Sequence, residues 1–118
     1  IFGTTDLSLP TKTLDLVEFY KSVKNKCILT ARSEIIRDKI EKVIEELGID
    51  YPNYGLHMYP YKNYNRAGVW KGNKIVELVQ KTEFKKVIFY DDNIKYLKSA
   101  TKVIKEKLPS LNYKYVKV

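Results

Sequence analysis

The chain has 118 residues, 44% of them hydrophobic and 31% charged, which suits a single domain over 1–118 with a core of its own. No apolar run approaches the roughly 20 residues that span a bilayer and no signal-peptide pattern is present, so we expect no membrane partner. The lone cysteine, Cys27, excludes an internal disulfide and fits a reducing, cytoplasmic compartment, with its thiol in the core. The net charge of +8 favours phosphate-rich partners.

The first half of the chain predicts its elements from apolar spacing. They are a strand exit and loop over 1–10, a helix over 11–24, a short strand over 27–30 and a helix over 36–47. Thr11, directly after Pro10, is the expected N-cap of the first helix. Ser33 is the expected cap of the second helix, and Gly48 is its expected stop.

The second half opens with an irregular, tyrosine-rich segment and then returns to regular elements. They are a short strand near 55–59 inside the irregular segment 49–68, a helix over 69–81, a strand over 85–92, a helix over 94–108 and a last strand over 111–118. Strands that alternate with helices of this length predict an α/β fold with a mainly parallel, Rossmann-like sheet and helices on both faces. Ligands bind such sheets at the carboxyl ends of the strands.

Two adjacent carboxylates, Asp91 and Asp92, end the apolar run of the strand over 85–92. Like charges beside an apolar layer need compensation. One interpretation is local, with Asp92 or Asn93 capping the helix that follows. The other is functional, with Asp91 and Asp92 binding Mg²⁺, which takes one or two protein carboxylates together with waters and phosphate oxygens.

The strand over 27–30 ends in Thr30, Ala31 and Arg32, which are candidates for contacting a substrate. A hydroxyl beside free N–H groups binds a phosphate oxygen, and an arginine clamps a phosphate with two parallel hydrogen bonds. The alternatives are that Thr30 only closes its strand and that Arg32 is a surface residue. Lys71, at the front of the helix over 69–81, would bring a cation to the acidic pair, or would be one surface lysine among many.

The order of these pieces resembles a known phosphohydrolase superfamily. The stretch ILTARSE (28–34), then VWKG (69–72), then VIFYDDN (87–93) is similar to motifs two, three and four of the haloacid dehalogenase (HAD) superfamily. The likeness is nearest to members with a minimal cap or none, such as the HAD domains of RNA-repair proteins and of polynucleotide or nucleotide phosphatases. It covers residues 1–100 approximately.

The resemblance implies a fold of the HAD type and a set of roles. Thr30 would bind the phosphoryl oxygen, Lys71 would offset charge on the nucleophile and the phosphate, and Asp92 with Asp91 would hold Mg²⁺. The reaction would pass through an aspartyl-phosphate. The substrate would be a phosphorylated nucleotide or an RNA or DNA end.

The chain departs from the superfamily at its first motif, a strand ending in Asp-x-Asp, which this sequence lacks. The only early carboxylate is Asp6, while Ile1 and the SLP at 8–10 fit the segment that follows the first motif in relatives. We therefore expect the motif, and the central strand that carries it, to lie upstream of Ile1 in a larger protein with other domains. The alternative is a lineage that lost the motif. On either account the chain should not hydrolyse phosphate esters.

The irregular segment interleaves aromatic and cationic side chains, as in proteins that bind single-stranded nucleic acid. The residues are Tyr51, Tyr54, Tyr59, Tyr61, Lys62, Tyr64 and Arg66. We name Tyr61 and Arg66 as candidate substrate-binding residues; the alternative is that these tyrosines only pack the segment onto the sheet. His57 has no second histidine or cysteine nearby, so we expect no metal role for it.

The sequence thus favours a Mg²⁺-dependent HAD-type phosphohydrolase domain for nucleotide or polynucleotide phosphate esters, incomplete without its nucleophile. The alternative is a non-catalytic HAD-like module that binds nucleic acid or a protein. A receiver-like signalling domain is disfavoured, because receivers place the acidic pair on their first strand, whereas here it follows Thr30 and Lys71.

Overall fold

A computed structural model describes the backbone of residues 2–4 and 11–118, and the side chains from residue 17 onward. The strands of this part of the chain are β1 (Phe2–Thr4), β2 (Ile28–Thr30), β3 (Leu56–Met58), β4 (Lys86–Asp91) and β5 (Asn112–Lys117). The helices are α1 (Thr11–Ser22), α2 (Arg37–Glu46), α3 (Ala67–Lys81) and α4 (Ile94–Lys107). Single 3₁₀ turns over Glu34–Ile36 and Tyr64–Arg66 lead into α2 and α3.

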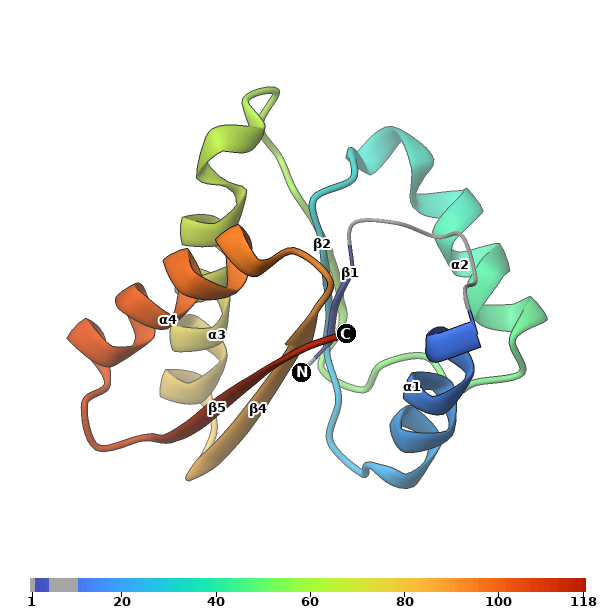
Figure 1. Cartoon of the computed structure of the whole chain (residues 1–118). Helices are drawn as coiled ribbons and strands as arrows, with labels where there is room; N and C mark the ends of the chain where they lie inside the picture. The colour runs from blue at the N-terminus through green and yellow to red at the C-terminus, as the bar shows by residue number, and fades with distance from the viewer. Residues whose placement is uncertain (1, 5–10) are drawn as a thin grey trace.

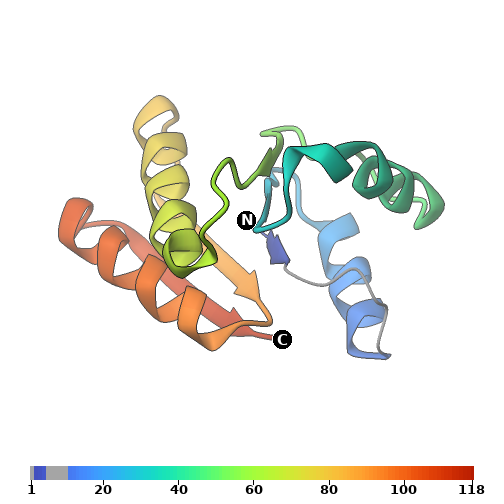
Figure 2. The same ribbon diagram turned by 90° about the horizontal axis from the view of Figure 1, so that it is seen from above.

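The strands form one five-stranded parallel sheet in the order β3-β2-β1-β4-β5. The chain runs outward from β1 to β3, crosses to β4 on the other side of β1, and runs outward again. Helices α1 and α2 lie on one face, and α3 and α4 lie on the other (Figures 1 and 2). The strand order reverses between β1 and β4, and the carboxyl ends beside such a reversal are where open parallel sheets bind ligands.

The predicted α/β class, the parallel sheet and the helices on both faces are confirmed. The predicted stop of the second helix at Gly48 is confirmed, since Gly48 takes φ 65° just after α2. Ser33 caps the 3₁₀ turn that leads into α2 and not α2 itself: its Oγ accepts a hydrogen bond from the N–H of Ile35 at 3.4 Å, whereas the N-cap position of α2 is Ile36. Helix α3 starts two residues earlier than predicted, at Ala67. Helix α1 starts at Thr11 itself, and the side chain of its predicted N-cap lies outside the described residues.

The prediction that the central strand would be missing from this chain is wrong. Phe2–Thr4 occupies that position and pairs with both neighbours, in register Thr4 to Thr30 on one side and Phe2 to Tyr90 on the other. A strand between two others hydrogen-bonds along both edges, which outweighs the poor strand propensity of a Gly-Thr sequence. Asp6 and the rest of the segment 5–10 lie outside the described residues.

The core has one cluster on each face of the sheet. The cluster under α3 and α4 consists of Cys27, Leu29, Ile75, Val76, Val87, Phe89, Leu97, Ala100 and Ile104. The cluster under α2 consists of Tyr20, Ile28, Ile40, Ile44, Leu56 and Met58. No helix in the described part of the chain is both long and apolar enough to cross a membrane.

Two glycines, four residues apart on α3, set the distance between α3 and α4. A Cβ at Gly68 would lie 2.9 Å from the Cα of Tyr96, and one at Gly72 would lie 2.9 Å from the Cα of Ala100. These distances are shorter than a real Cβ tolerates. The two helices are therefore in backbone contact along this line, which fixes the position of the inward side of α3 relative to α4.

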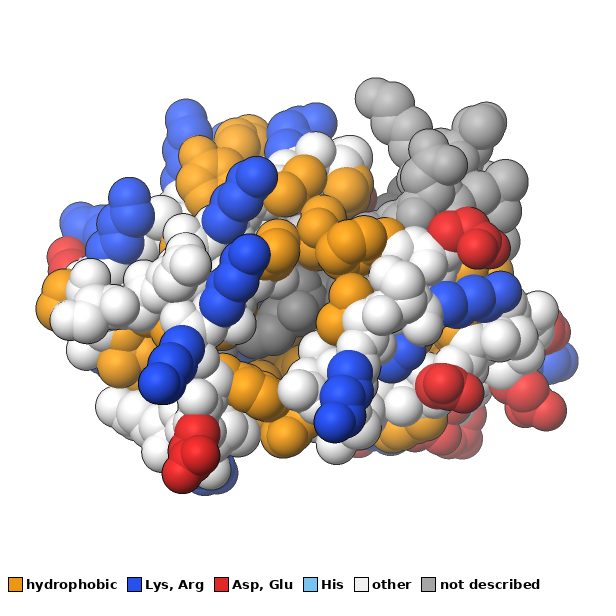
Figure 3. Space-filling view, turned by 90° about the horizontal axis from the view of Figure 1, so that it is seen from below, with side chains coloured by type: hydrophobic (Ala, Val, Ile, Leu, Met, Phe, Trp, Pro, Cys, Tyr) orange, Lys and Arg blue, Asp and Glu red, His pale blue; other side chains and the backbone are white. Residues whose placement is uncertain are grey.

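The end of α1, the turn that follows it and the strand β4 line a hollow of about 300 Å³, on the side of the molecule that Figure 3 shows. Hydrophobic side chains line it, including Phe19 and Tyr90, whose ring centroids are 5.2 Å apart. Lysine and arginine side chains are spread over this face rather than gathered into one patch (Figure 3). We assign no function to this hollow.

Cys27 is expected to resist alkylation in the folded chain. Cys27 lies just before β2 and is 2% exposed, and burial raises the pKa of its thiol to about 12. Since the thiolate is the reactive species, iodoacetamide at about pH 8 should modify the native protein far more slowly than the same protein in urea. Equal rates would contradict the burial. The raised pKa also stabilises the fold fully below about pH 9, and this contribution is lost as the pH rises toward 12.

Candidate active site

A buried ion pair joins α3 to β4 at the carboxyl edge of the sheet. Lys71 Nζ donates to Asp91 Oδ2 at 2.6 Å, and both side chains are 0% exposed. Lys71 follows Ala67 and precedes Ile75 by one helical turn each, and all three are fully buried, so the lysine belongs to the inward line of α3. Asp91 continues the inward line of β4, which alternates with half-exposed residues. Local geometry therefore directs both charges into the interior.

The pair has further support on both sides. The N–H of Asn93 donates to Asp91 Oδ1 at 2.8 Å, and Lys71 Nζ lies 5.1 Å from the centre of the Tyr96 ring. Burial lowers the pKa of Lys71, and Asp91 and Asp92 oppose that shift. Burial likewise raises the pKa of Asp91, opposed by Lys71 and by the Asn93 N–H. Each charge therefore depends on the other to exist in this place.

Asn93, not Asp92, caps α4. Its side-chain oxygen accepts from the N–H groups of Lys95 at 3.0 Å and Tyr96 at 3.2 Å. Asp92 follows the end of β4 and is exposed. The two carboxylates of the doublet thus face different surroundings, because Asp91 is inside the protein with a cation and Asp92 is at the solvent side of the strand end.

Thr30 ends β2 on the other side of β1 and is 0% exposed. Its Oγ1 accepts a hydrogen bond from the N–H of Arg32 at 3.1 Å, the local closure that the sequence left open as an alternative. A hydroxyl that accepts one bond can still donate its own hydrogen. Ala31 is buried and Arg32 is half-buried. With strands about 4.8 Å apart, Thr30 and Asp91 end strands separated by roughly 10 Å across β1.

The described residues offer little of a metal site by themselves. No group of three His, Cys, Asp or Glu among them could hold a metal ion. Both oxygens of Asp91 already accept hydrogen bonds, which leaves Asp92 as the carboxylate with access to solvent. One carboxylate fits Mg²⁺ only in company with waters, a phosphate or a further ligand.

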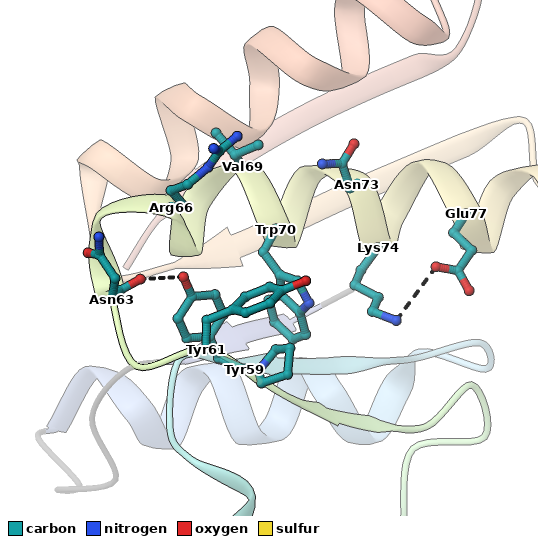
Figure 4. Close-up of a pocket in the computed structure, with 10 residues that line it drawn as sticks. Tyr59, Tyr61, Asn63, Arg66, Val69, Trp70, Asn73, Lys74 and Glu77 are labelled. Carbon is teal, nitrogen blue, oxygen red and sulfur yellow. Dashed lines mark hydrogen bonds and ion pairs between the residues drawn. The ribbon is translucent and has the colours of Figure 1, made fainter.

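A groove of about 640 Å³ lies along the flank of α3 that faces away from α4 (Figure 4). It is lined by Tyr59, Pro60, Tyr61, Asn63, Arg66, Val69, Trp70, Asn73, Lys74 and Glu77. Tyr59 is its floor: the ring is 2% exposed and lies 5.5 Å from the rings of both Tyr61 and Trp70, edge to face in each case. The two candidate substrate-binding residues Tyr61 and Arg66 belong to this groove, and both are exposed.

The segment before α3 holds the groove in shape through its own hydrogen bonds. The Tyr59 hydroxyl donates to the carbonyl oxygen of Asn63, and the Asn63 side chain accepts from the N–H of Asn65 at 2.9 Å. The N–H of Tyr59 bonds to the carbonyl oxygens of Thr30 at 3.0 Å and Arg32 at 3.2 Å. The backbone of Tyr59 therefore anchors the groove to the loop that follows Thr30.

A small buried cluster connects the groove with the ion pair. Ala31, Tyr59 and Ala67 pack together, with Trp70 and Tyr96 against them. Tyr96 is also the ring beside Lys71. A ligand that occupied the groove would thus lie one layer of side chains from the Lys71–Asp91 pair.

Comparison of the chain with protein-family models, curated proteins and solved structures gave no match. The likeness to the HAD superfamily therefore rests on the three sequence motifs.

Sequence reasoning missed the contributions of Tyr96, Trp70 and Lys74. Tyr96 lies in the predicted helix over 94–108 but belongs to none of the three motifs. Trp70 belongs to the VWKG motif, in which only Lys71 was given a role. A period-two reading of β4, with Val87 and Phe89 inward, would have indicated that Asp91 and not Asp92 points into the core. His57, for which no metal role was expected, has its Nε2 3.0 Å from the carbonyl oxygen of Tyr54.

Proposed function

We propose that the chain forms the phosphate-binding part of a Mg²⁺-dependent phosphohydrolase domain of the HAD type, acting on nucleotide or polynucleotide phosphate esters. The observation that carries this proposal is the buried Lys71–Asp91 pair, at the carboxyl end of a strand beside the reversal in strand order. The order of Thr30, Lys71 and the acidic doublet along the chain supports it. So does the convergence of Thr30 and Asp91 on one edge of the sheet.

The charges explain why such a site would need a metal. The charges of Arg32, Lys71, Asp91 and Asp92 sum to zero, so these four described residues together offer a phosphate dianion no net attraction. Mg²⁺ would supply that attraction, with Asp92 as its first protein ligand and Asp91 joining if its contact with Lys71 loosens. Thr30 would donate its hydroxyl hydrogen to a phosphoryl oxygen, Lys71 would hold positive charge close to the transferred group, and Arg32 would clamp the ester.

The nucleophile is the part that the described residues do not supply. An aspartyl-phosphate route needs a carboxylate beside the phosphorus atom, and the Asp-x-Asp pattern is absent from the sequence. We therefore expect the 118-residue chain to bind phosphate without hydrolysing esters. Release of phosphate from 5′- or 3′-phosphorylated oligonucleotides is expected only when a strand that ends in Asp-x-Asp takes the central position that Phe2–Thr4 occupies here, because the carboxyl end of that strand lies between those of β2 and β4.

Phosphate binding by the chain tests the proposal. Inorganic phosphate, titrated by calorimetry, should bind in MgCl₂ and not in EDTA. Asp92→Asn should weaken this binding about tenfold or more, because it removes the exposed carboxylate from the metal. Glu106→Gln, an exposed carboxylate near the far end of α4, is the matched control and should change nothing. A folded chain that ignores phosphate in Mg²⁺ would sink the proposal.

A second candidate, a non-catalytic module that binds nucleic acid, is favoured by the missing nucleophile together with the aromatic groove. On that account Asp92→Asn leaves nucleic-acid binding unchanged, and a central strand that ends in Asp-x-Asp does not restore hydrolysis. The same titration with an oligonucleotide in place of phosphate separates the two candidates.

A further inference from the structure

We propose that the groove beside α3 binds single-stranded nucleic acid, stacking a base on the rings of Tyr61 and Trp70 above the floor made by Tyr59. The proposal that a base stacks in this groove does not depend on the proposed function. The direction of the strand, with its terminal phosphate toward Thr30 and Lys71, rests on the proposed function.

The groove exposes aromatic rings that the core does not use. Tyr61 is 64% exposed, although its ring centroid lies 5.5 Å from that of Tyr59. Tyr64, which is outside the groove lining, is 54% exposed, and its ring centroid lies 6.0 Å from that of Tyr59. An exposed ring that already packs against a buried neighbour, as Tyr61 packs edge to face with Tyr59, can take a planar ligand at little further cost in side-chain entropy. Each base in a single strand offers such a planar face, and stacking of this kind tolerates any sequence.

The charges around the rings suit a phosphate backbone. Arg66 stands at the start of α3, and Lys74 lies on the same flank one turn beyond Trp70 (Figure 4). Among the described residues that line the groove, Glu77 is the single carboxylate, and it pairs with Lys74 at 3.6 Å and with Lys81 at 2.9 Å. The groove therefore presents aromatic faces between cations, on a chain of net charge +8.

The position of the groove fits a substrate that carries a terminal phosphate. Tyr59 anchors to the loop after Thr30 through its N–H, and Trp70 directly precedes Lys71. A nucleotide lying in the groove could thus extend its phosphate past Ala31 toward the carboxyl edge of the sheet. A duplex would fit poorly, because each base in its interior has both faces covered by its stacked neighbours and only the terminal pairs have one free face.

Trp70 is the only tryptophan in the chain, so its emission reports on the groove directly. An unphosphorylated thymidine ten-mer, titrated in EDTA, should quench that emission to a saturating value. Tyr61→Ala should weaken binding at least about fivefold, the low end of what loss of one stacking ring causes. Arg66→Gln should reduce the slope of log affinity against log salt concentration by about 0.7, the value for one phosphate contact with a single strand.

Matched controls lie elsewhere on the surface. Tyr115→Ala removes a ring that is 37% exposed on β5, and Lys105→Gln removes an exposed cation from α4; neither should alter the titration. A duplex of the same sequence should bind more weakly than the single strand. Unchanged Trp70 emission, or equal effects of the control and groove variants, would overturn the proposal.

A second titration separates this proposal from the proposed function. The ten-mer with a 5′- or 3′-phosphate, in MgCl₂, should bind more tightly than the unphosphorylated one. If quenching occurs without any gain from the phosphate, the groove stands and the phosphate site fails. If phosphate binds in MgCl₂ while Trp70 emission stays unchanged with every oligonucleotide, the phosphate site stands and the groove proposal fails.

Discussion

Asp91→Asn is expected to lower the free energy of unfolding by about 3–5 kcal/mol, because it leaves the Lys71 ammonium buried without its counter-ion. Lys71 Nζ and Asp91 Oδ2 are 2.6 Å apart and neither side chain reaches solvent. Removing one member of such a pair exposes the full desolvation penalty of the other. Urea unfolding at about pH 7 measures the difference, and Asp92→Asn, one residue away and exposed, should stay within about 0.5 kcal/mol of the parent.

The pH dependence of this variant identifies the cause. Without Asp91 the pKa of Lys71 falls further, and the unfolded chain then binds more protons than the folded one at neutral pH. Stability must therefore rise with pH, and the deficit should shrink between about pH 7 and pH 10 as the amine becomes neutral. A deficit independent of pH would show that lost packing, not an unpaired charge, destabilises the variant.

The double variant Lys71→Met, Asp91→Leu separates the cost of one unpaired charge from the contribution of the pair as a whole. Replacing both charges with apolar side chains of similar size is often nearly neutral for a buried pair, so the double variant should be more stable than either single one. If it also keeps its fold but no longer binds phosphate in MgCl₂, the pair serves binding rather than stability. Retained phosphate binding would remove Lys71 from the proposed site.

The sequence predicted the elements whose pattern is local. Strands such as β4 read as apolar runs, and α4 showed its helical period, so the parallel α/β arrangement followed from their alternation. The central strand was not predictable this way. Phe2–Thr4 has a weak strand sequence, and its place depends on edges supplied by Ile28–Thr30 and Tyr90, which are remote along the chain.

The candidate site divides in the same manner. Thr30, Lys71 and Asp91 were found because each ends a strand or lies near the start of a helix in a recognisable order. The sequence indicated only two of the groove residues as candidates for substrate binding, Tyr61 and Arg66. The segment before α3 has no hydrophobic period, and its fold depends on contacts that residue spacing does not predict. The hydrogen bond from the Tyr59 hydroxyl to the Asn63 carbonyl oxygen and the packing of Tyr59 on Trp70 are such contacts.

The sequence also contains a local signal for the packing of α3 against another helix. GVWKG places Gly68 and Gly72 one turn apart, on the line of α3 that the structure packs against α4. Small residues at this spacing let two helices approach to backbone contact. Lys71 lies between them, so the depth at which its amine meets Asp91 depends on how closely these helices approach.

Gly72→Ala is therefore expected to destabilise the chain by about 1–3 kcal/mol, against the usual trend for glycine in a helix. Alanine favours a helix interior over glycine by about 1 kcal/mol, but its Cβ here would lie 2.9 Å from both the Cα and the carbonyl oxygen of Ala100. Backbone atoms cannot turn aside as a side chain would, so α3 and α4 must separate. Gly68→Ala should behave likewise, since its nearest atoms include the Cα of Tyr96.

Gln80→Ala is the control, because Gln80 is an exposed residue near the end of α3. It should leave the free energy of unfolding within about 0.5 kcal/mol of the parent, or raise it slightly. Because separation of α3 from α4 also moves Lys71 away from Tyr96 and Asp91, Gly72→Ala should weaken Mg²⁺-dependent phosphate binding, whereas Gln80→Ala should not. A stabilising Gly72→Ala would mean that the two helices are farther apart than described.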